Sequence, residues 1–207
     1  MADDYPEIEA TLRRLAFYRL EPDAPLPARD AAAAEATAMG FALPDDYAWF
    51  CSTQGAGAFD QHAMLPLPPG CRLGPEFRLD IVYAVGAGED WDPLALAGDT
   101  YLDRLPPGLL PIGTDPGGNL VLLGAQDRAG VYAWDHEHRE LADGELDRRI
   151  EDLRGADIDV QQLDIDQLLL LWEQMFPDRV ANPTGHGNLY GMAGSFSEAC
   201  AALRVAG

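Results

Sequence analysis

The densest group of potential acids, bases and metal ligands is the segment Asp135-His136-Glu137-His138. His136 and His138 are two positions apart, so their side chains point the same way only on a strand. No HExxH or CxxC pattern accompanies them. We therefore predict no metal site here and interpret the segment as a turn at a strand end, with Asp135 and His136 hydrogen-bonded to nearby backbone. A small hydrolase that uses Asp135, His136 or Glu137 is the catalytic alternative.

Two other segments could carry chemistry, and a structural interpretation is favoured for both. Residues 115–119, Asp-Pro-Gly-Gly-Asn, could cradle a phosphate, but they join two predicted strands and lack a Lys-Ser/Thr ending. A tight hairpin with glycine at positive φ suits them better. Cys51 with Ser52 and His62 could indicate a nucleophilic cysteine, but Cys51 falls on the apolar face of a predicted helix. We predict a protein that is not an enzyme and binds no cofactor.

Calcium is the remaining metal alternative. The pairs Asp157/Asp159 and Asp164/Asp166 could supply carboxylates, but the EF-hand pattern with its central glycine and terminal glutamate is absent. A solvated acidic face and helix caps explain these residues better.

The segment 89–93, Glu-Asp-Trp-Asp-Pro, has the composition of a protein-recognition edge. A rigid ring can anchor a partner while carboxylates select its Arg or Lys side chains. Alternatively, Trp91 is buried in the core and its acidic neighbours lie in water. The glycine-rich residues 182–190 are likewise either a partner contact or only a connection. The residues predicted to contact a partner are Glu89, Asp90, Trp91, Asp92, Tyr101, Asp103, Asp135, His136 and Glu137.

Charge is the unusual feature of the composition. The chain carries 35 Asp and Glu against 14 basic residues, which gives a formal charge of −21. All 14 basic residues are arginine, so the chain supplies no phosphate-loop lysine, Schiff-base lysine or lysine general base. Nucleic acids and anionic membranes need cationic groups to neutralise phosphate, so the charge argues against both and favours a basic protein partner. Solubility is the simpler explanation of the same charge.

Length and cysteine usage indicate one soluble domain in a reducing compartment. At 207 residues and 47% hydrophobic, the chain is long enough for one sizeable core. It starts with acidic residues and no apolar signal region, and its longest purely apolar run, residues 168–172, is far shorter than a membrane span. Cys51, Cys71 and Cys200 form no CxxC pair and suit buried thiols. We expect a cytoplasmic protein.

Helices are predicted near both ends of the chain. An amphipathic helix is expected through Ile8, Leu12, Leu15 and Leu20, an alanine-rich helix over 30–39, and a third helix over 43–50. In the last third, residues 146–153 have one apolar face. Asp164 with Gln167 can cap a helix, and Ser195 with Glu198 has capping-box spacing before the final helix.

The middle of the chain predicts strands. Residues 54–101 are expected to be mainly connections, with one strand at 77–85. Residues 109–113, 119–123 and 130–134 are apolar runs separated by turn-like segments, which predicts an antiparallel meander. Helices, then a meander, then helices predict an α+β domain with helices packed on a mostly antiparallel sheet.

Four segments, in order, resemble the SUKH superfamily in its Smi/Knr branch. They are Leu-Pro-Asp-Asp-Tyr at 43–47 followed by Phe50, the segment 109–119, the segment 130–137, and a closing helix that begins at Ser195-Phe196. The residues that carry the resemblance, and to which it gives a structural role, are Leu43, Pro44, Tyr47, Phe50, Gly113, Asp115, Gly117, Gly118, Asn119, Tyr132 and Trp134. Where the family tends to have Asn-Gly-Gly, residues 54–57 are Gln-Gly-Ala-Gly.

The resemblance implies one SUKH-like domain over 1–207, with a core at about 29–140 plus 195–205 and a helical insertion at about 141–194. It also implies a non-catalytic binding protein. In bacteria such proteins are usually immunity partners of secreted or contact-delivered toxins. A toxin that attacks nucleic acid must present a cationic groove, so a basic, nuclease-like toxin is the expected partner. The alternative is a regulatory interaction scaffold, as in the fungal cell-wall regulators of the family.

Overall fold

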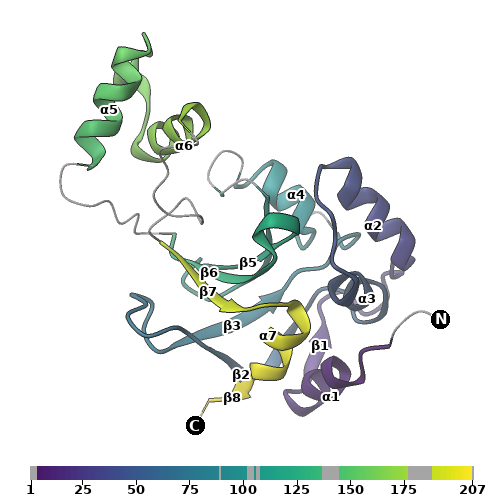
Figure 1. Cartoon of the computed structure of the whole chain (residues 1–207). Coiled ribbons are helices and arrows are strands. Elements are labelled where there is room, and N and C mark those ends of the chain that lie inside the picture. Colours follow the sequence, from purple (N-terminus) through teal and green to yellow (C-terminus); the bar gives the residue numbers. More distant parts are fainter. Residues whose placement is uncertain are drawn as a thin grey trace.

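The computed structural model describes residues 4–88, 90–101, 105, 108–136, 145–176 and 188–206 (Figure 1). Within these ranges, eight strands form one antiparallel sheet. Seven of them follow one another across the sheet in chain order: β1 (Phe17–Arg19), β2 (Gly57–Pro66), β3 (Glu76–Val82), β4 (Leu109–Thr114), β5 (Leu120–Gly124), β6 (Gly130–Trp134) and β7 (Leu189–Ala193). The last, β8 (Arg204–Val205), pairs with β2. The predicted meander is β4, β5 and β6.

The helices precede, interrupt and follow these strands. They are α1 (Pro6–Arg14), α2 (Arg29–Ala38), α3 (Asp45–Thr53), α4 (Pro93–Gly98), α5 (Glu145–Gly155), α6 (Ile165–Met175) and α7 (Phe196–Ala202), with 3₁₀ turns η1 (Gln126–Arg128) and η2 (Val160–Gln162). Helices packed on an antiparallel sheet confirm the predicted α+β class.

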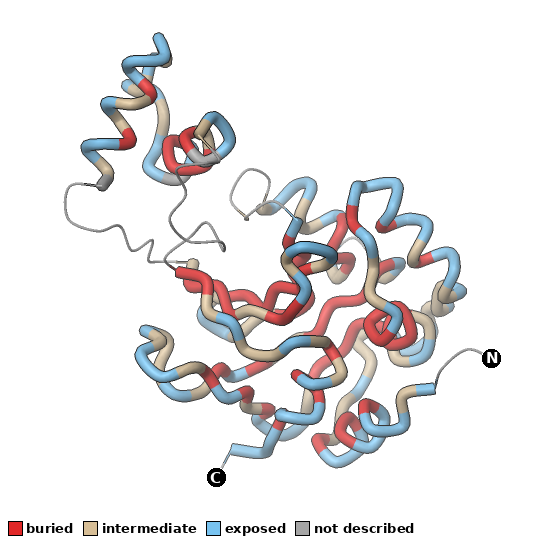
Figure 2. The backbone as a smooth tube through the Cα atoms, in the orientation of Figure 1, coloured by how far each residue is buried: buried red, intermediate tan, exposed pale blue. Residues whose placement is uncertain are grey.

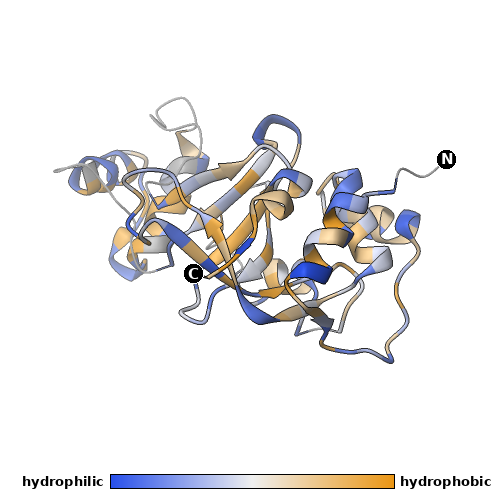
Figure 3. Ribbon diagram, turned by 90° about the horizontal axis from the view of Figure 1, so that it is seen from below, coloured by the Kyte–Doolittle hydropathy of each residue, from blue (hydrophilic) through white to orange (hydrophobic). Residues whose placement is uncertain are grey.

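Both faces of the meander are buried. Val121, Leu123 and Val131 belong to the main core, which also contains most of the buried apolar residues of α1, α3 and α7. The alternate positions Leu120 and Leu122 belong to a second cluster on the other face. This alternation follows from the period of two along a strand. Figure 3 shows hydrophobic residues along the central strands.

The centre of the main core is an aromatic contact between α3 and α7. The Tyr47 and Phe50 rings stack with centroids 5.9 Å apart, and Phe196 packs edge-on against Tyr47 at 5.0 Å. Beside the rings, the buried carboxylate of Asp46 accepts hydrogen bonds from Ser197, at 2.8 Å from its backbone N and 3.0 Å from Oγ. Helices that are distant in the chain are thereby joined by both apolar and polar contacts.

The turn between β4 and β5 matches the predicted hairpin. The Asp115 carboxylate accepts from the backbone N of Gly117 and Asn119, both at 2.8 Å, and from Asn119 Nδ2 at 2.7 Å. Gly118 has φ +93°, a conformation that glycine adopts without strain. The aspartate therefore closes the turn, and its two oxygens are occupied within the loop.

Several predicted boundaries are wrong. The first helix does not reach Leu20, because α1 ends at Arg14 and Ala16 has φ +52°, after which β1 pairs with β2. Residues 54–101 contain the long strand β2 and helix α4, where mainly connections were expected. The pairing register of β2 shifts between Ala58 and Ala63, and the polar residues 60–62 lie in this irregular part of the strand. They interrupt the alternation of apolar and polar residues that would have indicated a strand.

Helices α5 and α6 form a cluster of their own. Leu153 of α5 packs with Leu169 and Trp172 of α6, and both helices have buried and exposed residues (Figure 2). Asp164 and Gln167 form the predicted capping box. Strand β7 lies within the range expected to be a helical insertion and pairs with β6. The division into one domain with an insertion stays a prediction.

We expect Asp46→Ala to lower the free energy of unfolding by about 2–4 kcal/mol, because it leaves the Ser197 donors and the first turn of α3 without their acceptor. Urea denaturation measures the change. The control is Asp45→Ala. The Asp45 side chain is 84% exposed, and its ion pair with Arg29 is long, at 3.7 Å. This control should cost less than about 1 kcal/mol. Equal losses for the two variants would contradict the assigned role of Asp46.

Candidate partner-binding site

Asp92 shapes the loop that connects β3 to α4. Its Oδ1 accepts from the backbone N of Leu94 at 2.8 Å, which caps α4, and its Oδ2 accepts from the backbone N of Gly86 at 2.7 Å. The residue is only 7% exposed. Both oxygens of the Asp92 carboxylate therefore serve the loop itself. Its neighbour Asp90 is exposed.

A broad groove, with about 850 Å³ of space accessible to water, lies between this loop, α4 and α2, the helices drawn beside each other in Figure 1. It is lined by Glu35, Ala38, Met39, Ala87, Asp90, Asp92, Leu94, Ala95, Leu96, Gly98, Asp99 and Thr100. Met39 is 62% exposed. Its Cε lies 3.8 Å from the position a Cβ would take at Gly98, so the end of α2 approaches the end of α4.

Three carboxylates of the groove are available to a partner. Glu35, Asp90 and Asp99 are exposed, and none of them makes a hydrogen bond or ion pair through its carboxylate with the residues that the structure describes. Neither arginine nor histidine occurs among the described residues of the lining. An apolar patch around Met39 bordered by free carboxylates suits a basic protein surface.

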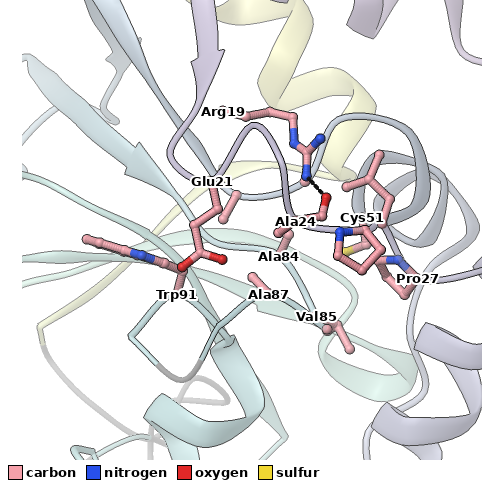
Figure 4. Close-up of a pocket in the computed structure, with 14 residues that line it drawn as sticks. Arg19, Glu21, Ala24, Pro27, Cys51, Ala84, Val85, Ala87 and Trp91 are labelled. Atoms are coloured by element: carbon pink, nitrogen blue, oxygen red, sulfur yellow. Dashed lines mark hydrogen bonds between the residues drawn. The ribbon is translucent and has the colours of Figure 1, made fainter.

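A much smaller pocket, with about 20 Å³ of space accessible to a water molecule, adjoins the groove, and Ala87 lines both (Figure 4). Its walls include Glu21, Trp91 and residues of the proline-rich segment before α2. Trp91 is half-buried and packs against the main core, while it also lines the pocket. Trp91 therefore has both of the surroundings considered for it, because one part of the ring contacts the core and another part lines a surface pocket.

Asp135 and His136 directly follow β6 and are not among the residues that line the groove. Asp135 is 3% exposed; its backbone N donates to the Asn188 carbonyl at 3.0 Å, and its own carbonyl accepts from Asn188 Nδ2 at 2.5 Å. His136 uses the Asn119 side chain: its backbone N and Nδ1 lie 3.2 and 3.0 Å from Asn119 Oδ1. The Asn188 backbone carbonyl is thus one partner of Asp135, and the Asn119 side chain is one partner of His136.

The other predicted contacts are distributed differently. Tyr101 packs edge-on against Trp134, with centroids 6.3 Å apart, in the second core cluster. Glu89, Asp103 and Glu137 lie outside the described residues. Over the described ranges, no group of three or more His, Cys, Asp and Glu side chains is arranged to hold a metal ion.

Cys51 is unsuited to nucleophilic catalysis. It is buried on α3, and burial raises the pKa of its thiol to about 12, the opposite of an activated cysteine. His62 is exposed on β2.

The residues of the four recognised segments lie mainly in the core and in turns. Leu43 and Pro44 precede α3, Tyr47 and Phe50 are buried on it, and the glycines and polar residues of 113–119 form the β4–β5 hairpin. A Cβ at Gly113 would come within 2.7 Å of the Ile81 carbonyl, so that glycine permits β3 and β4 to pair. The model of the SMI1 / KNR4 family (SUKH-1) matches residues 25–150. The chain belongs to the SMI1/KNR4 (SUKH-1) family.

The match to SUKH-1 includes α2, the β3–α4 loop and α4, so the groove lies within the family region. Searches of curated proteins and of solved structures find no match. In the described part of this SUKH-1 chain, no helix is long and apolar enough to cross a membrane.

Glu21, Glu35, Met39 and Asp99 are among the lining residues of the groove and pocket that sequence reasoning missed. Glu35 and Met39 are four positions apart on a predicted helix, and this spacing places both on one face. That signal was available. Glu21 and Asp99 have no comparable signal, because only the tertiary structure brings them beside the loop that carries Trp91.

The three thiols should differ in reactivity. We expect iodoacetamide at about pH 8 to label half-buried Cys71 in the folded protein, whereas buried Cys51 and Cys200 react only after denaturation. Mass spectrometry of the alkylated peptides measures this. Labelling of Cys51 as quickly as Cys71 without denaturant would contradict the assigned burial.

The same burial predicts alkaline destabilisation. The pKa of Cys51 is raised from about 9 to about 12, because a thiolate in the core would lose its hydration. Between about pH 9 and 12 the Cys51 thiol ionises in the unfolded chain but not in the folded protein, which favours unfolding. The stability that the buried neutral thiol contributes is therefore complete below about pH 9 and is lost as the pH rises toward 12. Unfolding followed by circular dichroism should therefore require less urea at each step of pH above 9.

Proposed function

We propose that this SUKH-1 protein is a non-catalytic immunity protein that binds and neutralises a cognate, basic bacterial toxin in the cytoplasm. The observation that carries the proposal is the groove between α2 and α4, where Glu35, Asp90 and Asp99 surround exposed Met39. The resemblance to a family that includes toxin immunity proteins supports the same conclusion.

Neutralisation would occur by occlusion. A nuclease-like toxin presents a cationic groove to the phosphate backbone, and a protein of charge −21 is attracted to such a surface over long range. Once the two proteins are in contact, the apolar patch around Met39 excludes water and the surrounding carboxylates select arginine and lysine side chains. The toxin's active or functional face is then covered. The same charge disfavours nucleic acid or a membrane as a direct partner.

The proposal predicts that the groove carboxylates act as specific contacts. In the triple variant Glu35→Gln, Asp90→Asn, Asp99→Asn, affinity for the toxin should fall at least about tenfold and rescue of growth on co-expression should be lost. The toxin is obtained by affinity capture with the tagged protein from its native organism at low salt, with release at high salt. Affinity is measured by calorimetry and rescue by growth rate.

A matched control changes the same charge elsewhere. Asp60→Asn, Asp127→Asn and Glu151→Gln neutralise three exposed carboxylates that do not line the groove. This control should lower affinity less than about threefold, since it alters only the long-range attraction. Equal losses would show that the groove is not the binding surface. Capture of cellular proteins that do not harm growth would replace immunity with the regulatory scaffold.

A further inference from the structure

The pocket beside the groove contains an unused carboxylate next to an aromatic ring. Glu21 and Trp91 both line the pocket, and Figure 4 shows the Glu21 carboxylate next to the Trp91 indole ring. Glu21 is exposed, and its carboxylate makes no hydrogen bond or ion pair with any described residue. Its Oε1 lies 2.9 Å from the position of a Cβ at Gly88, so the carboxylate lies against the loop that carries Trp91.

The walls of the pocket are built before any partner arrives. Pro25 and Pro27 restrict the segment before α2, and the Arg19 guanidinium holds it by donating to the carbonyl oxygens of Pro22 and Ala24 at 3.0 and 2.6 Å. A preformed site binds with a smaller loss of conformational entropy.

An aromatic face beside a free carboxylate is the environment that suits a guanidinium group. The planar guanidinium can stack on an indole ring and donate two parallel hydrogen bonds to a carboxylate, whereas an ammonium is a point charge without that shape. We propose that an arginine side chain of the partner protein docks at the mouth of this pocket, with its guanidinium against Trp91 and Glu21. The identity of the partner rests on the proposed function, but the chemistry of the pocket can be tested without the partner.

The charge of Arg19 is the main opposing effect, because it also lines the pocket and would repel a second cation. Its two carbonyl partners hold it on the wall. Three exposed acidic residues on the adjoining segments, Glu21, Asp23 and Asp90, outnumber it. The net local charge therefore favours a cationic side chain.

Trp91 supplies a direct signal for binding. The chain has four tryptophans, and the other three, Trp49, Trp134 and Trp172, are buried. We expect the tripeptide acetyl-Gly-Arg-Gly-amide, titrated at low salt, to protect Trp91 fluorescence from acrylamide quenching and to shift one of the four indole N–H resonances. The lysine tripeptide should bind at least about threefold more weakly, and the citrulline tripeptide, which is uncharged, should produce no shift.

Two variants distinguish binding at the pocket from general electrostatic attraction of the tripeptide to the acidic protein. Glu21→Gln should weaken binding of the arginine tripeptide at least about fivefold, whereas Asp23→Asn, an equal charge change on the same segment but outside the pocket lining, should weaken it less than about twofold. Equal effects of the two variants, or an indole resonance that does not move, would overturn the proposal.

The tripeptide experiment tests the pocket, and the toxin experiment tests immunity, so the two can succeed or fail independently. Binding of the tripeptide by a protein that rescues no toxin would leave the pocket intact and reject immunity. A toxin that is neutralised equally well by the wild type and by Glu21→Gln would support immunity and reject the pocket as the arginine site.

Discussion

The contact between α3 and α7 is the constraint on which the rest of the molecule depends. Asp46 accepts two hydrogen bonds from Ser197, which is 151 positions further along the chain, and the rings of Tyr47 and Phe196 pack beside them. Two distant segments thereby close the main core. The Tyr47 hydroxyl then donates to the Tyr83 carbonyl at 2.9 Å, just after β3. The β3–α4 loop begins there. A helix buried in the core thus fixes the start of the segment that carries the proposed binding surface.

The acidic residues of this protein have two different roles. Asp46, Asp92 and Asp115 accept hydrogen bonds from backbone N–H groups, where a carboxylate replaces the water that burial or a tight turn removes. Glu35 on α2 and Asp99 directly after α4, by contrast, make no hydrogen bond or ion pair through their carboxylates with the residues described. A net charge of −21 is therefore an incomplete description. The position of each carboxylate decides whether it stabilises the fold or remains available for a partner.

Membership of the SUKH-1 family and the local geometry contribute different parts of the functional argument. The family indicates a protein that binds other proteins, and the residues that carry its pattern are in the core and in turns. The groove and pocket are formed around them by surface positions on α2, α4 and the loop between β3 and α4. Partner choice can therefore change through surface substitutions while the core stays the same, since recognition depends on a few contact residues on a stable framework.

The sequence alone determined the elements whose signals are local. A capping pair predicted α6, proline and two carboxylates predicted the start of α3, and apolar runs separated by turns predicted β4, β5 and β6. The short strands β1, β7 and β8 and the irregular β2 needed the tertiary structure, because their pairing partners supply the hydrogen bonds and no periodic pattern reveals them. The site divides in the same way. Composition predicted a recognition segment at Asp90 and Trp91, but only the packing of α2 and the preceding segment against the β3–α4 loop placed Glu35 and Glu21 beside it.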